Sequence, residues 1–311
     1  MHVGMKKKIM IALVCGLVLI GGVLILIKVL GNEKKSHSDE DTPQSENTVT
    51  PTSDTTNTPT PTIEVKEPKY HVGDIVVLGK YEQDGKADNG AENIEWIVLD
   101  VKETSVLIIS KYALAAMPFH NAAGETNWET GSIRTWLNGE FIEKAFDETE
   151  RTYLTTSSVE NKDYYLGITA EGILKAQNTG DGLEEVAYHT AGGNTTTDKV
   201  FLLSVDEANE YFSTSEDRSS VFTSAAREQF LGYCIEDAKA YGMTDEKMIR
   251  DNVEKWEQEH GTGSCYWWLR SPGMSSSYCS VVDIDGKMIN SQSADNKEGG
   301  VRPAMWVILP E

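Results

Sequence analysis

Positively charged residues are scarce in this sequence after residue 35. Lys and Arg together number 28 against 49 Asp and Glu, which gives a formal net charge of −21. Residues 1–35 contribute +5, from six Lys and one Glu, so residues 36–311 carry −26. Proteins that bind nucleic acid neutralise its phosphates with Lys and Arg. The composition therefore excludes DNA and RNA as partners.

Cysteines and recognisable catalytic motifs are also few. Four Cys in 311 residues exclude a small fold built around many disulfides. None of the six His stands at the H-x-x-x-H spacing of a metal site, and no G-x-S-x-G motif occurs. The run from Asp283 begins like an EF-hand loop, but Ala294 stands where that loop needs Glu. We therefore predict no catalytic residue, no metal ion and no cofactor.

The longest apolar run lies near the N terminus. It covers 9–27, nineteen uncharged residues, and a helix needs about 20 to cross a bilayer. The apolar region of a signal peptide is usually about 7–15 residues, followed by a small-x-small site that does not follow this run. We predict a transmembrane signal anchor over 9–30, with a cleaved signal peptide as the alternative. The three Lys of residues 1–8 place that end in the cytoplasm and the rest of the chain outside the cell.

The segment that follows, residues 31–68, is rich in Ser, Thr, Pro and acidic side chains and has no helical or strand period. Such a segment cannot bury enough apolar surface to offset the entropy lost on ordering. We predict a disordered stalk that holds a folded extracellular domain, residues 69–311, away from the membrane. The predicted location is the cell membrane, crossed once.

The folded domain has strand patterns at both ends and helix patterns between them. Ser204 with Glu207 forms a capping box, and Asp285-Gly286 between alternating runs predicts a two-residue hairpin turn. The expected strands are 74–78, 94–101, 105–110, 200–203, 266–270, 277–284, 287–291 and 301–309. The expected helices are 132–138, 140–154 with a break near Asp147, 205–212, 225–241 and 244–259. We predict an α+β domain with its termini paired in one sheet and a helical insertion at 225–262.

Three stretches carry a family resemblance. They are GDIVVLGKYEQD at 73–84, NWETGSIRTWLNGEF at 127–141, and YWWLRSPG at 266–273 with GVRPAMWV at 300–307. Together they resemble a widespread bacterial domain of unknown function that occurs on secreted and membrane-anchored proteins. The last pair is also similar to the end of the C-type-lectin-like fold of formylglycine-generating enzymes. This resemblance implies a C-type-lectin-like mixed domain with N-terminal antiparallel strands, a core strand at Arg302 and a surface loop at 273–299.

Three cysteines follow the apolar run: Cys234, Cys265 and Cys279. Formylglycine-generating enzymes use a closely spaced Cys pair. Here Cys265 and Cys279 are fourteen residues apart and flank a different motif, so the catalysis does not carry over. Outside the cell, a Cys265–Cys279 disulfide would contribute about 3 kcal/mol in the chain-entropy model. Buried thiols are the alternative, and the sequence leaves both open.

The strongest cluster of candidate residues is Trp267, Trp268, Arg270 and Arg302. Successive strand residues point to opposite faces, so we expect at most one of the two Trp in the core of a one-sided sheet. The other would be exposed, where it could stack on a sugar or a peptide. The residues expected to be structural are Trp128, Arg134, Trp136, Trp268, Arg270, Arg302 and Trp306. The residues expected to bind a ligand are Trp267, Ser275, Tyr278, Asn290 and Gln292.

These patterns lead us to expect a membrane-anchored extracellular binding module that recognises a glycan or a surface protein through 273–299. One alternative is an extracytoplasmic hydrolase or modifying enzyme that uses unassigned carboxylates. Another is a structural cell-envelope protein. A perturbed carboxylate pair in a deep pocket would favour the enzyme, whereas a shallow aromatic and polar surface would favour binding.

Overall fold

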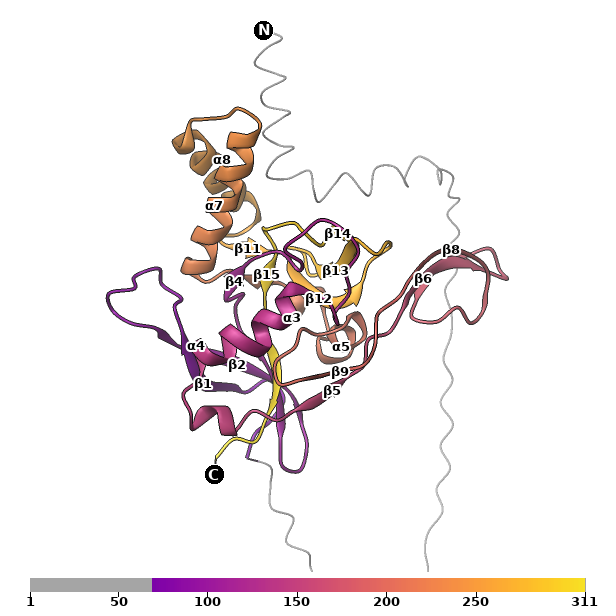
Figure 1. The fold of residues 1–311 in the computed structure, drawn as a ribbon, viewed down its shortest axis with the longest axis horizontal. Coiled ribbons are helices and arrows are strands. Elements are labelled where there is room, and N and C mark those ends of the chain that lie inside the picture. The colour runs from indigo at the N-terminus through magenta and orange to yellow at the C-terminus, as the bar shows by residue number, and fades with distance from the viewer. Residues whose placement is uncertain (1–68, 311) are drawn as a thin grey trace, which may run out of the picture.

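Sheets and helices are combined in residues 69–310, which the computed structural model describes (Figure 1). The α+β class predicted from the sequence is confirmed. The predicted signal anchor (9–30) and stalk (31–68) lie outside the described residues. Within 69–310, no helix combines the length and the apolar character that a membrane crossing requires.

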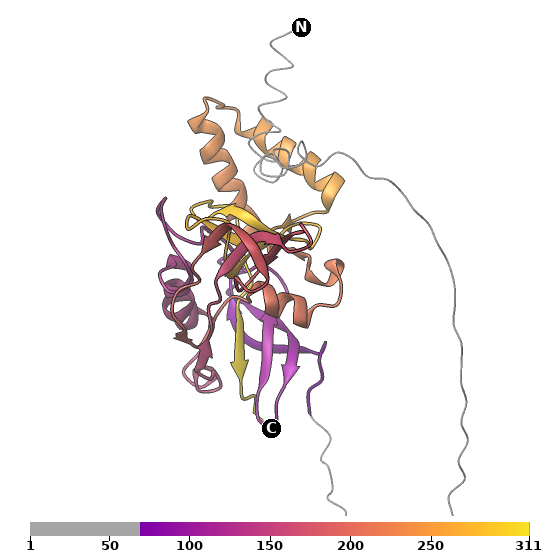
Figure 2. The ribbon, with the colours of Figure 1, turned by 90° about the vertical axis from the view of Figure 1, so that its right-hand side faces the viewer.

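The first sheet joins the two ends of the domain. Its strands, in order, are β1 (Ile75–Tyr81), β2 (Glu92–Val101), β3 (Val106–Ser110) and β16 (Ala304–Val307), all antiparallel. The predicted pairing of the termini is confirmed, and Figure 2 shows the yellow last strand beside the purple first ones. The single strand predicted at 301–309 is wrong, because Arg302 and Pro303 interrupt it. Proline has no N–H to donate to a strand ladder.

The second sheet holds the YWWLRSPG motif in its middle. Its strands, in order, are β14 (Met288–Ser293), β13 (Tyr278–Val282), β12 (Trp267–Pro272), β15 (Gly300–Val301) and β4 (Ala115–Ala116). Trp267 and Trp268 are both fully buried, with 0% exposure. The prediction that at most one of them belongs to the core is wrong, because both faces of β12 are covered. Phe212 packs edge-on against Trp267, and Phe119 packs edge-on against Trp268.

The turn between β13 and β14 is longer than predicted. The N–H of Asp283 donates to the carbonyl of Lys287 at 2.7 Å. The Asp283 carboxylate accepts from the N–H groups of Asp285 and Lys287 at 2.9 and 2.8 Å. The two-residue turn is therefore wrong, although Asp285-Gly286 does mark the reversal of the chain.

One helical segment lies along the first sheet at β1. α3 (Ser132–Trp136) continues through a π-helical turn (Leu137–Phe141) into α4 (Ile142–Ala145). The break predicted near Asp147 is confirmed, since α4 ends at Ala145, but the continuation of that helix to 154 is wrong. There Phe146 turns to extended backbone and is buried in the core, so that only a 3₁₀ turn (Glu150–Thr152) follows.

The predicted capping box is confirmed at the start of α5 (Val205–Tyr211). Ser204 Oγ accepts from the N–H of Glu207 at 3.1 Å, and the Glu207 carboxylate accepts from the N–H of Ser204 at 2.8 Å. A short helix α6 (Ser215–Arg218) follows. The strand predicted just before α5, at 200–203, is wrong, since only a single bridge joins Phe201 to Ala304.

Two longer helices stand together above the second sheet in Figure 1. α7 (Ser224–Ala240) and α8 (Glu246–His260) occupy the range expected to be helical. They are joined by an apolar cluster and by two hydrogen bonds from the Arg227 guanidinium to the Glu257 carboxylate, at 2.7 and 2.6 Å. The short strands β10 (Ser220–Val221) and β11 (Ser264–Cys265) pair where this segment leaves and rejoins the sheets.

A three-stranded sheet projects from the side of the domain (Figure 1). Its central strand is β6 (Tyr164–Thr169), flanked by β7 (Leu174–Gln177) and β8 (Leu183–Thr190). We call these three strands the arm. At its base β5 (Ser157–Val159) pairs with β9 (Thr196–Asp198). The sequence patterns predicted no element in the arm.

Candidate functional site

Two adjoining pockets lie between the root of the arm, the start of α5 and the second sheet. Pocket A has a volume of about 270 Å³, and pocket B has a volume of about 240 Å³. Asn178, Asp206 and Ser271 line both of them. The two pockets therefore adjoin at these three residues, which we call their shared wall.

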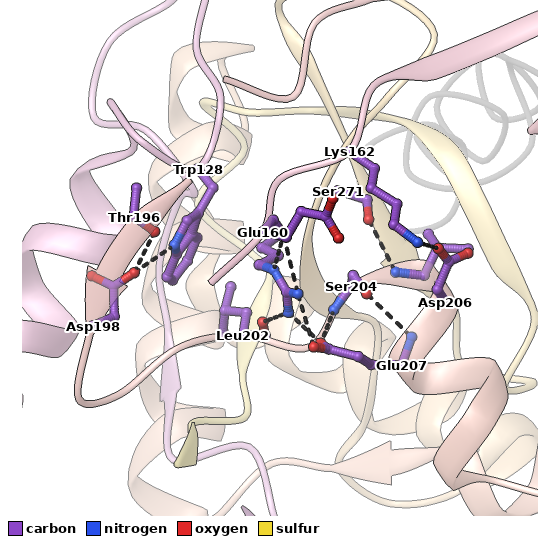
Figure 3. A network of polar contacts seen from close by, with 12 residues as sticks. Trp128, Glu160, Lys162, Thr196, Asp198, Leu202, Ser204, Asp206, Glu207 and Ser271 are labelled. Atoms are coloured by element: carbon purple, nitrogen blue, oxygen red, sulfur yellow. Dashed lines mark hydrogen bonds and ion pairs between the residues drawn. The ribbon is translucent and has the colours of Figure 1, made fainter. Parts of the chain in front are cut away.

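Asp206 is the polar centre of this shared wall, in the first turn of α5. Its Oδ2 accepts a hydrogen bond from Lys162 Nζ at 3.0 Å (Figure 3) and another from Asn178 Nδ2 at 2.5 Å. The hydrogen bond to Asp206 raises the pKa of Lys162. The N–H of Val205 donates to Ser271 Oγ at 3.0 Å. These contacts hold the arm root and β12 against the same helix start.

Pocket A combines polar groups with apolar walls. Asn290 Nδ2 of β14 donates to the Tyr164 hydroxyl of β6 at 2.5 Å, and burial raises the pKa of Tyr164. Ala176, Pro272 and Met288 contribute apolar surface. Ligand sites typically show this mixture, in which a few placed polar groups orient a molecule that apolar walls enclose.

Arg270 closes pocket B from the core side and is only 5% exposed. Its Nη1 and Nη2 both contact the Glu207 carboxylate, the latter at 2.8 Å. Nη1 also donates to the carbonyl of Leu202 at 2.9 Å, and Nη2 donates to that of Glu160 at 3.3 Å (Figure 3). One guanidinium thus joins three chain segments around the pocket.

Arg302 is likewise buried, with 1% exposure. Its guanidinium donates to the carbonyls of Ser110, Arg218 and Lys111 at 3.1, 3.4 and 3.5 Å, and lies 4.9 Å from the Trp267 ring. Burial lowers the pKa of Arg302 to about 10. This arginine holds loop carbonyls inside the core, away from both pockets.

The other residues expected to be structural lie in or against the core. Trp128 Nε1 and Arg134 Nε donate to the buried carboxylate of Asp198 at 3.0 and 2.7 Å, and Figure 3 shows the Trp128 contact. Trp268 Nε1 donates to a backbone carbonyl at 2.8 Å. Trp136 and Trp306 are half-buried and pack on the core, and Trp306 also reaches the edge of pocket B.

The five residues predicted to bind a ligand are separated by the fold. Trp267 and Gln292 are 0% and 2% exposed, so their predicted place on a ligand surface is wrong. Both sit in a sheet that is covered on two sides. Ser275 and Tyr278 are half-buried near the start of β13 and line neither pocket. Asn290 does line pocket A.

The alternative of a Cys265–Cys279 disulfide is wrong. Both cysteines are buried thiols, and Cys279 lies opposite Pro272 in the sheet, seven residues along the chain from Cys265. A disulfide needs Cα atoms about 4.4–6.8 Å apart. Burial raises the pKa of Cys265 to about 12 and raises that of Cys279 further. Neither thiol is therefore activated as a nucleophile.

One cluster of three carboxylate side chains within 69–310 is compact enough to suggest a metal site. One oxygen from each of Glu82, Asp84 and Glu92 lies within 4.8 Å of the other two. Those oxygens already accept backbone hydrogen bonds. Glu92 accepts from the N–H of Gln83 at 2.7 Å, and Glu82 accepts from the N–H of Gly85 at 2.8 Å. The cluster therefore has a structural task in ordering the loop between β1 and β2.

Residues that sequence reasoning missed supply most of the shared site. Tyr164, Asn178 and Asp206 were not among the candidates. The run Asn178-Thr-Gly-Asp-Gly182 is rich in turn residues, and it forms the loop between β7 and β8, which lie on opposite sides of β6. This run indicates a turn but predicts neither the strand order of the arm nor the pocket, since the pocket also needs α5 and β14.

Outside the pockets, the half-buried Glu298 makes stability depend on pH. Burial raises the pKa of Glu298 to about 7 from an ordinary 4.5, although a hydrogen bond from Cys234 Sγ at 3.5 Å opposes the shift. The folded state thus keeps a proton that the unfolded state has lost between these pH values. We expect the free energy of unfolding to fall by about 2–3 kcal/mol as pH rises from 4.5 to 8.

Glu298→Gln removes this titration, so the variant should gain about 2–3 kcal/mol over the parent chain at pH 8 and little at pH 4.5. Urea unfolding at both pH values measures the difference. Glu236→Gln is the control, because Glu236 is an exposed acid of α7 that forms an ion pair with Lys297, the residue next to Glu298. If the free energy of unfolding changes with pH by the same amount in Glu298→Gln and in the parent chain, then Glu298 is not the cause of the pH dependence.

Comparison with known proteins identifies a family. The model of the family described as Domain of unknown function (DUF6273) matches residues 103–309. This range includes strands β3 and β16 of the first sheet, the whole second sheet, the arm and both pockets. No curated protein and no solved structure matches the chain. The chain therefore belongs to the DUF6273 family of domains of unknown function.

Proposed function

We propose that this chain is a membrane-anchored extracellular binding module whose ligand occupies pockets A and B together. The observation that carries the proposal is that Asn178, Asp206 and Ser271 line both pockets, so a ligand that reaches across these residues would contact both cavities. Amide, hydroxyl and carboxylate groups along two adjoining pockets suit a chain-like polar ligand, either a glycan or a protein segment.

The distribution of perturbed acids favours binding over the enzyme alternative. A general acid or base works best with a pKa near the working pH. Among the described carboxyl groups, burial raises the pKa of Glu298 to about 7 and raises that of Asp283 above its ordinary value. Neither residue lines pocket A or pocket B. The acid whose pKa is raised to about 7, and the other acid whose pKa is raised, therefore both lie away from the two pockets.

The anchor over 9–30 and the stalk over 31–68 complete the proposal, because they would present the site outside the cell. The C-type-lectin-like character belongs to the same proposal. It is supported by the pairing of the first strands with the last one and by the burial of Arg302 within the core. In this proposal, 273–299 contributes Ser280, Met288, Ile289 and Asn290 to pocket A, and the arm with its root, α5 and β12 supply the other lining residues.

Filling pocket A tests the proposal. Ala176→Phe adds a ring at an exposed pocket position of β7 without removing a hydrogen-bonding group. Ala187→Phe adds the same ring at an exposed position of β8 that lines neither pocket. The full chain should bind a member of a glycan array or a peptide array saturably. Ala176→Phe should weaken that binding at least tenfold, and Ala187→Phe less than twofold. Equal losses, or no binder on either array, would contradict the proposal.

A further inference from the structure

One face of the arm leads out of pocket A. Tyr164, Leu166 and Ile168 alternate along β6, and alternate strand residues point to the same side. Tyr164 lines pocket A and is 8% exposed, Leu166 is half-buried, and Ile168 is 37% exposed. This face therefore begins inside the pocket and ends in the open.

The neighbouring strands widen this face with apolar side chains. Leu166 lies opposite Ala176 of β7 and Tyr188 of β8, and Ile168 lies opposite Leu174. Residues directly opposite in a sheet share a face. Leu174 and Tyr188 are 45% and 49% exposed. We call Leu166, Ile168, Leu174 and Tyr188 the shelf; it is continuous with pocket A through Ala176.

The reverse face of the arm is different in character. There Tyr165 stacks on His189 at 4.3 Å between ring centroids, and His189 Nε2 lies 2.9 Å from the Asp163 carboxylate. Near the root of the arm, the reverse face is therefore occupied by side chains that contact one another through polar and ring interactions. The apolar row is concentrated on the side that faces the pocket.

Charge and spacing indicate what covers the shelf. Residues 163–190 hold five acids and one Lys, a net charge of −4 with His neutral. Such a surface attracts a basic partner. The shelf side chains along β6 repeat every second residue, about 6.6 Å, which is the repeat of alternate side chains in any extended polypeptide. A sugar chain would need several polar partners along the row, whereas the shelf offers leucine, isoleucine and one tyrosine, and Glu185 opposite Ile168 adds one acid that suits a basic partner.

Building on the proposed function, we propose that the ligand is an extended polypeptide. It lays alternate apolar side chains along the shelf, carries basic residues between them, and places one end in pocket A. The exposed shelf would be buried only in the complex, which makes the apolar row a source of affinity and the acidic arm a source of selectivity for basic segments.

The test uses the full chain and three probes of stated composition. They are a decapeptide that alternates Lys and Leu, a decapeptide with the same residues in two blocks, and chitotetraose. Tyr188→Ser removes shelf surface, and Val186→Ser is its matched control. Val186 is 46% exposed and lies opposite Gly167, on the reverse face of the arm. Both positions are exposed, so both variants are expected to fold.

We expect the alternating peptide to bind at least tenfold more tightly than the block peptide. Tyr188→Ser should weaken its binding at least tenfold and Val186→Ser less than twofold. Equal binding of the two peptides, equal effects of the two variants, or no peptide binding overturns the inference. Chitotetraose binding that Ala176→Phe abolishes, without peptide binding, would overturn the polypeptide and leave the binding module standing. If none of the probes and no array member binds, both proposals fail.

Discussion

Replacing Arg270 with Met is expected to lower the free energy of unfolding by about 3–5 kcal/mol, because it leaves a partly buried charge without its partner. Glu207 would lose both guanidinium contacts, and the carbonyls of Leu202 and Glu160 would lose their donors. The side chains of Arg270 and Glu207 are only 6% and 27% exposed, so solvent screens them little. For a domain of this size the melting temperature should fall by roughly 6–15 °C.

Two further variants separate this explanation from a general loss of charge. Arg250→Met removes an arginine whose ion pair with Glu228 is 42% and 55% exposed, and it should cost no more than about 1 kcal/mol. Adding Glu207→Gln to Arg270→Met should restore part of the loss, since the amide keeps the capping position without an unpaired charge. Chemical denaturation of the parent chain, the three single variants Arg270→Met, Glu207→Gln and Arg250→Met, and the double variant measures both effects. A double variant that loses the sum of the two single losses would contradict the account.

Local signals in the sequence were sufficient where neighbours along the chain decide the structure. Ser204 and Glu207 are three residues apart, and their capping box needs only the first turn of α5. The presence of both ends of the domain in one sheet was also predicted, since strand patterns stand at both ends, although the sequence did not indicate that β16 would pair with β3. These features are fixed by short-range periodicity and by the need to pair strand edges.

The environment of β12 could not be predicted in the same way. Alternation places Trp267 and Trp268 on opposite faces, and that part was right. Whether a face is covered depends on distant segments, here Phe212 after α5 and Phe119 before α3. The alternation of side chains along a strand shows which face each one is on, but it does not show whether another segment packs on that face. The prediction of an exposed Trp267 therefore failed for a tertiary reason.

The candidate site was only partly accessible from sequence for a related reason. Asn290 was found because polar side chains near a predicted turn are ordinary binding candidates. Tyr164 and Asp206 were missed, because they come from the arm and from a helix that joins Asn290 only in the folded chain. The arm itself has weak patterning, since most of β8 is exposed on both faces. A strand buried on neither face lacks the apolar alternation by which strands are recognised.

Gly286 shows how a turn residue can be essential for a reason beyond the turn. Its φ of +75° is one that L side chains adopt only with strain, about 1–2 kcal/mol. In addition, a Cβ at this position would lie 1.7 Å from the carbonyl oxygen of Ser215, the first residue of α6. Arg218 Nε donates to the carbonyl of Gly286 at 2.9 Å. The hairpin turn and α6 therefore meet backbone to backbone.

We expect Gly286→Ala to lower the free energy of unfolding by roughly 3–5 kcal/mol, the sum of the strain and of a forced separation of the turn from α6. Gly182 is the matched control, since its φ is also +75° and a Cβ there would meet nothing within 4 Å. Gly182→Ala should therefore show the strain alone, about 1–2 kcal/mol. Urea unfolding of the two variants measures the difference between them. Because both positions carry the same backbone strain, any excess at Gly286 reports the contact with Ser215, and equal losses would mean that this contact relaxes without cost.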